Sequence, residues 1–316
     1  MSARAPRIRA SSLLLPLVAA VLGCARGETA AGGMTVFAAG SLARPLRAAL
    51  DTIASADGTA VRLEIMGSRE LLRAITSLGR TPDLIVSADA DELERALIPT
   101  WISSSTTFAT NRVVLALSPR RAVHDSITTV NWADVAGGGT LRIARADPAR
   151  APLGYRTQLV WQLAERALGQ PGLAARLAAA SPDALLRGNE SDLAALLDSG
   201  DADAAWCYES LARSLKLPYV RIGDAVDLGS VADSATYRLA TVRIAGDRPG
   251  DSVTVTGTPI RYAIAVLNNG PHVIAATTLR ERLLDTVSVR IMRRIGLDVL
   301  DTPRVVTSAP SLSMPP

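Results

Sequence analysis

The sequence predicts an α/β fold arranged as two lobes, and two observations support this. Short apolar runs alternate with longer amphipathic stretches, as strands and helices do in layered α/β proteins. Two long β runs, residues 111–117 and 260–267, bracket a middle block with its own alternation. A chain that leaves one lobe and later returns crosses between the lobes twice. We therefore expect lobe I at 34–115 plus 268–302, lobe II at 116–267, and a cleft between them.

The first lobe is predicted to repeat strand, turn and helix three times. The expected strands are 34–38, 61–65 and 83–87, and the helices that follow them are 42–56, 69–78 and 91–98. In sheets wound in this way, ligands gather beyond the carboxyl ends of the strands.

Two of those strand ends carry the same motif, Gly40-Ser41 and Gly67-Ser68. Each places a small residue and a hydroxyl at the first turn of a helix, where unpaired backbone N–H groups can bind a small anion. A serine here can also be a plain helix N-cap without a ligand. The repetition of the motif, rather than either copy alone, indicates an oxyanion site.

The middle block and the end of the chain give further elements. Expected strands are 141–144 and 204–208, and expected helices are 154–168, 192–199, 273–284 and 287–295. The Pro- and Ser-rich end, residues 303–316, is expected to be a disordered tail.

The first residues carry export information. Three Arg precede an apolar run that is short for a membrane span, and Val21-Leu-Gly-Cys24 resembles a bacterial lipobox. We expect residues 1–23 to be a lipoprotein signal peptide, Cys24 to be lipidated, and 24–33 to tether an exported domain. An ordinary secretory signal beside an accidental Cys is the alternative.

Composition excludes several classes of partner and site. Lys and Arg total 34 against 30 Asp and Glu, and three of the Arg lie within 1–23, so the remainder is near neutral. This gives no argument for nucleic acid. Cys207 is left without a disulfide partner, and His124 and His272 lack ligand spacing, so no metal site is expected.

Catalytic machinery is not visible. The chain has no G-x-S-x-G elbow, P-loop, G-x-G-x-x-G fingerprint or Cys/His cluster. We expect a binding protein rather than an enzyme, without a cofactor.

The candidate ligand-binding residues are mostly neutral donors. Ser41 and Ser68 come from lobe I, while Tyr155, Arg156 and Tyr208 come from lobe II. Hydroxyls and helix-terminal N–H groups can hold a tetrahedral dianion because their dipoles are oriented in advance. Arg156 would add charge, or would pair with a local carboxylate; the tyrosines would bind, or only line the cleft.

Several stretches, in order, resemble the substrate-binding proteins of molybdate/tungstate ABC transporters, in particular the tungstate-binding branch. They are Val36-Phe-Ala-Ala-Gly-Ser-Leu42, Met66-Gly-Ser68, Asp83-Leu-Ile-Val-Ser-Ala-Asp89, Phe108-Ala-Thr-Asn-Arg112, Pro152-Leu-Gly-Tyr-Arg156, Tyr208-Glu-Ser-Leu-Ala212 and Pro259-Ile-Arg-Tyr-Ala263. The resemblance implies a type II periplasmic-binding-protein fold with the oxyanion in the interlobe cleft. It also implies a permease and an ATPase as partners, and matches Ser41 and Ser68 to two oxyanion-binding serines.

The chain departs from that branch at two positions. Members commonly have an Asp where this chain has Ala151, and some have a Glu where it has Cys207; those carboxylates complete a six-coordinate metal. Asp147 and Glu209 are nearby but stand at other positions. We therefore expect a four-coordinate oxyanion held by hydrogen bonds, or a shifted specificity. Cys207 is either a thiolate ligand or a buried inert thiol.

These observations favour a monomeric, lipid-anchored receptor for molybdate or tungstate. The alternatives are a receptor for sulfate or phosphate, a hydrolase or transferase on a similar scaffold, and a lipoprotein whose cleft no longer binds.

Overall fold

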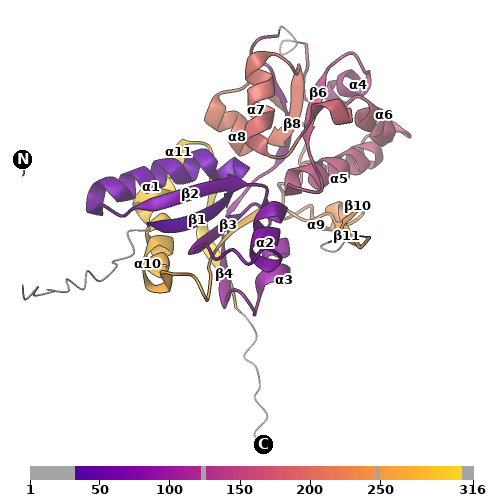
Figure 1. Ribbon diagram of the computed structural model, residues 1–316. Coiled ribbons are helices and arrows are strands. Elements are labelled where there is room, and N and C mark those ends of the chain that lie inside the picture. The colour runs from indigo at the N-terminus through magenta and orange to yellow at the C-terminus, as the bar shows by residue number, and fades with distance from the viewer. Residues whose placement is uncertain (1–32, 122–125, 247–249, 308–316) are drawn as a thin grey trace, which may run out of the picture. The chain divides into compact units, whose positions relative to one another are not determined.

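The computed structural model describes residues 33–121, 126–246 and 250–307 (Figure 1). The predicted signal peptide, Cys24 and the tether up to residue 32 lie outside the described residues, as do His124 and the chain beyond residue 307.

The larger sheet has six strands in the order β13-β4-β12-β3-β1-β2. Its strands are β1 (Met34–Ala39), β2 (Val61–Met66), β3 (Leu84–Ser87), β4 (Ser104–Thr110), β12 (Arg261–Val266) and β13 (Asp298–Thr307). The three predicted N-terminal strands pair in parallel, with β1 between β2 and β3. Strand β12 is antiparallel to both β3 and β4, and β13 is antiparallel to β4.

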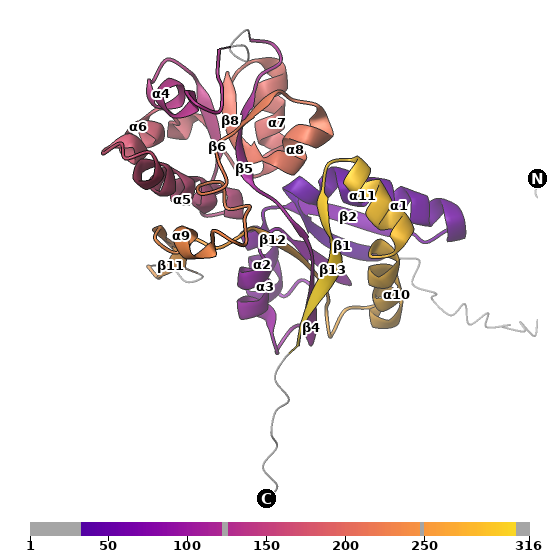
Figure 2. The same cartoon turned by 180° about the vertical axis from the view of Figure 1, so that it is seen from behind.

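Helices cover both faces of this sheet (Figures 1 and 2). They are the 3₁₀ turn η1 (Gly40–Leu42) and the helices α1 (Ala43–Asp57), α2 (Ser68–Thr76), α3 (Ala90–Leu97), α10 (Val273–Leu283) and α11 (Thr286–Arg294). Two neighbouring residues of β1, Val36 and Phe37, belong to two separate apolar clusters. Val36 lies in the cluster that includes α1 and α10, and Phe37 in the cluster that includes α2 and α3. This follows from the two-residue period of a strand that is buried on both faces.

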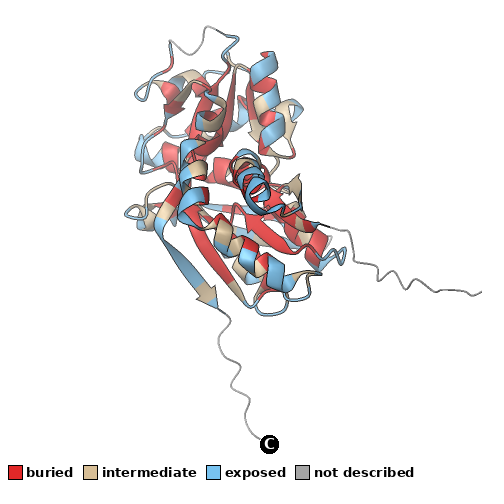
Figure 3. Ribbon diagram, turned by 90° about the vertical axis from the view of Figure 1, so that its left-hand side faces the viewer, coloured by how far each residue is buried: buried red, intermediate tan, exposed pale blue. Residues whose placement is uncertain are grey.

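The smaller sheet has the order β7-β6-β8-β5-β9. Its strands are β5 (Val113–Leu117), β6 (Ile143–Ala146), β7 (Leu186–Arg187), β8 (Ala204–Tyr208) and β9 (Tyr219–Arg221). The helical elements of this lobe are α4 (Trp132–Gly137), α5 (Pro152–Ala167), α6 (Leu173–Ala179), η3 (Asp183–Leu185), α7 (Glu190–Ser199), α8 (Glu209–Leu215) and α9 (Ser234–Tyr237). Its adjacent strands β5 and β8 are buried at every residue, and the strands at the centres of the two sheets are coloured as buried in Figure 3.

A two-stranded antiparallel hairpin, β10 (Thr241–Ala245) with β11 (Ser252–Thr256), extends from the second lobe. Arg69 and Arg73 on α2 donate hydrogen bonds to the carbonyls of Ala245 and Gly246, at 2.7 and 3.2 Å. The hairpin therefore contacts the first lobe.

The sheets divide the chain differently from the predicted lobes 34–115 plus 268–302 and 116–267. Residues 261–266 form β12, inside the larger sheet, and residues 113–117 form β5 in the smaller one. An apolar run predicts a strand but not its sheet, because pairing depends on residues distant in sequence. The expected tail also differs in part, because residues 303–307 belong to β13.

Candidate functional site

Both Gly-Ser turns lie at buried ends of first-lobe strands. Ser41 is in η1, directly after β1, and Ser68 is the first residue of α2, directly after β2. Both serines are buried, and neither helical start has a hydrogen bond from a capping side chain. The Ser41 hydroxyl accepts a hydrogen bond from the hydroxyl of Tyr262 at 3.0 Å. The Ser68 hydroxyl accepts one from the backbone N–H of Ala88 at 3.0 Å.

The glycine of each turn is closely approached by the second lobe. A β-carbon at Gly40 would stand 2.3 Å from the Glu190 Oε2 atom, and one at Gly67 would stand 2.1 Å from the carbonyl oxygen of Arg150. A side chain at Gly67 would collide with backbone, and one at Gly40 would require the Glu190 carboxyl group to move, so the turns that hold Ser41 and Ser68 face the other lobe directly.

Helix α5 begins opposite the second turn. Pro152 opens it, Ala151 precedes it without a side-chain cap, and both are buried. The α-carbon of Ala151 lies 3.5 Å from the position of a β-carbon built on Gly67. The starts of α2 and α5, neither of them capped by a side chain, therefore approach one another across the lobes. At α5 few N–H groups are available, because Pro152 has none and the Gly154 N–H donates to the Ala151 carbonyl at 3.0 Å.

The predicted residues Tyr155 and Arg156 project from the first turn of α5 onto the first lobe. Arg156 Nη1 donates to the Ala88 carbonyl and to the Tyr208 hydroxyl, both at 2.7 Å. Its Nη2 atom lies 3.2 Å from Asp89 Oδ2, and the Tyr155 hydroxyl donates to the same carboxylate. Asp89 also caps α3 by accepting from the Glu92 N–H at 2.9 Å.

Burial and charge set the protonation of this cluster. Burial raises the pKa of Tyr155 and of Tyr208 well above the usual range, so both stay neutral hydroxyls. Burial alone would lower the pKa of Arg156, but Tyr208 and Asp89 outweigh it and hold that pKa well above its usual value. Arg156 is thus a permanent buried cation whose carboxylate partner lies on the other lobe.

Tyr208 joins this cluster to the first turn. Its ring packs edge-on against the ring of Tyr262, with centroids 6.0 Å apart and an interplanar angle of 77°. Asn111, where the chain passes from β4 to β5, donates to the Tyr262 hydroxyl and to Ser210 Oγ. Contacts therefore run from Ser41 through Tyr262, Tyr208 and Arg156 toward Ala88 and Ser68.

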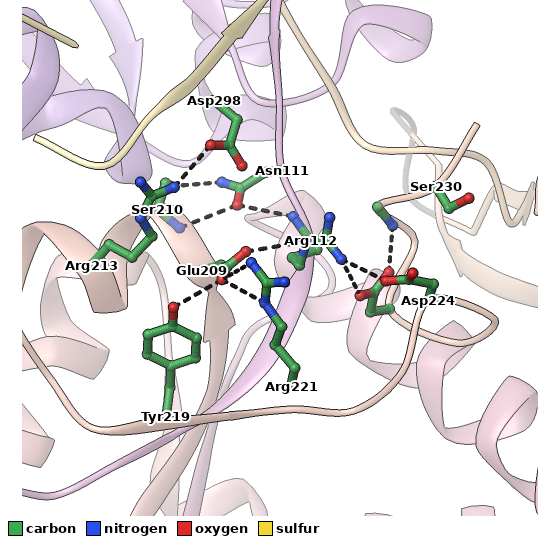
Figure 4. A network of polar contacts seen from close by, with 12 residues as sticks. Asn111, Arg112, Glu209, Ser210, Arg213, Tyr219, Arg221, Asp224, Ser230 and Asp298 are labelled. Carbon is green, nitrogen blue, oxygen red and sulfur yellow. Dashed lines mark hydrogen bonds and ion pairs between the residues drawn. The ribbon is translucent and has the colours of Figure 1, made fainter. Parts of the chain in front are cut away.

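A second polar network lies beside the crossing and engages Glu209 (Figure 4). Glu209 is fully buried, and its carboxylate lies 3.1 Å from Arg112 Nε and 2.8 Å from Arg221 Nη2. The Tyr219 hydroxyl donates to it at 2.9 Å. Asp147, the other nearby acid, accepts from the N–H of Ala149. Neither acid contacts Ser41 or Ser68 in the described structure.

Cys207 is fully buried, and its thiol lies 3.4 Å from the carbonyl oxygen of Tyr208. Burial raises the pKa of the thiol to about 12, so the neutral form prevails near pH 7. This protonation state favours the inert thiol over the thiolate ligand.

Four residues of the cluster had no role in the sequence prediction: Asp89, Asn111, Glu190 and Tyr262. Asp89, Asn111 and Tyr262 lie within the stretches that resemble the molybdate/tungstate-binding family, and this resemblance is the sequence signal that could have indicated them. Glu190 stands outside them and looks like an ordinary acid at a helix start.

Beside the cluster lies a hollow of about 260 Å³, lined by Asp89, Glu92, Tyr155 and Arg156 together with residues of β11. Ser41 and Ser68 do not line it. Within the described ranges, no group of three His, Cys, Asp or Glu residues could hold a metal ion. The helices of the same ranges include none with the length and apolarity needed to cross a bilayer.

The fold and the interlobe position of these donors define a solute-binding protein with a type II periplasmic-binding-protein fold. The sequence profile of the bacterial extracellular solute-binding proteins matches residues 34–298, and the chain belongs to that family. A solute-binding protein of Petrotoga mobilis without an assigned solute is 32% identical over 280 residues, covering 88% of this chain and 87% of its own. A Haloferax volcanii protein, provisionally named an ABC transporter molybdenum-binding protein, is 33% identical and covers 77% of this chain and 75% of its own. The molybdate/tungstate-binding protein of Pyrococcus abyssi is 24% identical, covering 94% of each chain.

Solved structures agree on the fold. The periplasmic molybdate-binding protein of Azotobacter vinelandii has a TM-score of 0.62 at 17% identity, covering 85% of this chain and 100% of its own. The sulfate-binding protein of Mycobacterium tuberculosis has a TM-score of 0.58 at 12% identity, covering 85% and 87%. The predicted fold class is therefore confirmed.

Proposed function

We propose that this protein is the extracytoplasmic substrate-binding component of an ABC importer, and that it captures molybdate or tungstate between its lobes. A permease and an ATPase would be its partners. The names of the Haloferax and Pyrococcus relatives support this choice of solute. Lipid anchoring through Cys24 and a monomeric state belong to the same proposal.

One observation carries the proposal: the two Gly-Ser turns lie at uncapped helical starts that face the second lobe, next to buried Arg156. Ser41 and Ser68 would supply hydroxyls, and the start of α2 would supply backbone N–H groups. Such oriented donors suit a small anion that only accepts hydrogen bonds. Because Ala151 and Cys207 provide no carboxylate, we propose a four-coordinate oxyanion.

The contacts of the serines do not favour hydrolysis. A nucleophilic serine needs a base within about 3 Å. The Ser41 hydroxyl instead meets Tyr262, whose pKa burial raises above its usual value, and the Ser68 hydroxyl meets a backbone N–H. His272, the histidine in the described ranges, lies 3.2 Å from Asp83.

Isothermal titration calorimetry of residues 34–316 with molybdate, tungstate and sulfate tests the proposal. We expect sub-micromolar binding of the first two and none of sulfate, whose shorter bonds would leave donors underused. Tight binding of sulfate or phosphate instead would assign another oxyanion. If none of the anions binds, the protein would be either a receptor for a different solute or a lipoprotein whose cleft no longer binds.

A further inference from the structure

Glu190 is a buried acid whose position brings it to the first Gly-Ser turn. It is the first residue of α7, behind the N-cap Asn189, and it is 1% exposed. Its Oε2 atom has no hydrogen-bond partner in the described structure. A β-carbon on Gly40 would lie 2.3 Å from that atom, so the carboxyl group rests against the turn that carries Ser41.

The groups that face this carboxyl come from three elements. Arg156 on α5 attracts the negative charge of the ionised carboxyl group. The same charge raises the pKa of Cys207 and Tyr208 on β8 and that of Tyr262 on β12. Arg156, the cation among them, is already bound to Asp89. An ionised Glu190 would therefore be desolvated without a dedicated partner, which is costly.

Protonation removes that cost and changes what the group can do. Burial raises the pKa of Glu190 to about 7, against the lowering effects of its own backbone N–H and of Arg156. A neutral carboxylic acid has an O–H donor, whereas a carboxylate only accepts. Next to Ser41, an additional donor suits a fully deprotonated oxyanion, and a carboxylate would repel it.

We propose that Glu190 is a further ligand-binding residue of the interlobe site, and that it binds as the neutral acid and donates a hydrogen bond to the oxyanion. This rests on the proposed function. When the lobes separate, the carboxyl group meets water and returns to its ionised form. Closure around the ligand therefore takes up one proton from solvent, which becomes the O–H of the acid.

The sign of the pH effect follows from the raised pKa of the bound form. With a usual value of 4.5 in the open form and about 7 in the closed form, affinity is greatest at low pH and declines as pH rises toward 7. The expected increase in Kd from pH 5.5 to pH 7.5 is roughly twentyfold. Proton uptake at pH 6 should be about 0.9 per molybdate bound.

The test is calorimetry of the full chain with molybdate between pH 5.5 and 7.5, in two buffers of different ionisation enthalpy. Glu190→Gln keeps a donor without a titrating proton, so we expect it to bind with a nearly constant Kd and no proton uptake. Glu92→Gln is the control for the other buried acid between the lobes, because burial also raises the pKa of Glu92 to about 7 and Arg156 of the second lobe lies near it. It should remove only any proton that Glu92 itself takes up and keep the pH dependence that is due to Glu190.

The outcomes separate this inference from the proposed function. If the unmodified protein binds molybdate with no proton uptake at pH 6, the inference is overturned, whether or not the variants fold. It is also overturned if Glu190→Gln keeps the original pH dependence, or if Glu92→Gln removes it. Failure of the unmodified protein to bind molybdate or tungstate at any pH would instead overturn the proposed function.

Discussion

Replacing Arg156 with Met tests whether the buried interlobe pair supports ligand capture. The guanidinium bonds the Ala88 carbonyl and the Tyr208 hydroxyl at 2.7 Å, and lies 3.2 Å from Asp89. The two charged side chains are only 5% and 9% exposed. Removing one partner of such a pair costs about 3–5 kcal/mol, because the other charge stays buried.

The location of the two charges determines which equilibrium is affected. Asp89 and Arg156 belong to different lobes, so separation of the lobes returns both to water. The penalty therefore falls on the closed, ligand-bound form. We expect the Kd for molybdate to rise between roughly a hundredfold and a few thousandfold, while the thermal midpoint of the ligand-free protein changes little.

Calorimetry and thermal unfolding of Arg156→Met provide the assay. The Asp89→Asn, Arg156→Met double variant is the matched control, and it should recover part of the lost affinity because no unpaired charge remains. A Kd within threefold of the original in the single variant would refute the reasoning. A large fall in the ligand-free midpoint would show that the pair supports folding rather than closure.

Three other changes give distinct expected results. Ser41→Ala and Ser68→Ala should each weaken oxyanion binding by roughly 1–3 kcal/mol, since each removes a hydroxyl from a buried site; unchanged calorimetric affinity in both would remove these serines from the site. Ala151→Asp should either add a carboxylate ligand to the metal of the bound oxyanion or repel the dianion, and X-ray absorption of the loaded protein distinguishes these two results. An unaltered spectrum together with unaltered affinity would place this position outside the site. Arg112→Met should lower the free energy of unfolding by about 3–5 kcal/mol, because buried Asp227 loses a cation 3.0 Å away, while Glu209 keeps Arg221. Denaturant titration measures this, and a loss below about 1 kcal/mol would contradict it.

The sequence predicted elements better than their assembly. The strand–turn–helix repeats of the first lobe were recovered because alternation and Gly-Ser turns are local signals. Strand β4 was missed because Ser104–Thr110 is rich in hydroxyl side chains, although its central residues are buried. The hairpin strands β10 and β11 were also missed, although both alternate between exposed and less exposed residues. Each of these two strands has only five residues, and alternation over so short a segment is a weak signal for a strand.

The candidate site shows the same limit. The sequence could name Ser41, Ser68 and Arg156, because each begins or follows a recognisable turn. It could not show that Glu190 meets Gly40, because 150 positions separate them and only the packing of α7 against η1 joins them. Tyr262 stood within a quoted stretch, but its hydroxyl could be linked to Ser41 only once β12 was placed in the larger sheet.

The close approach of the second lobe to Gly40 and Gly67 affects how the site would discriminate between solutes. At Gly67 the limit to lobe closure is backbone against backbone, because the carbonyl oxygen of Arg150 would lie 2.1 Å from a β-carbon there. A backbone contact cannot yield by changing a rotamer, whereas the Glu190 carboxyl group opposite Gly40 is the end of a side chain and can. The approach of the lobes is therefore fixed on the Ser68 side and adjustable on the Ser41 side. An oxyanion held between them would meet one rigid wall and one that adapts, so discrimination by bond length would come from the Gly67 side.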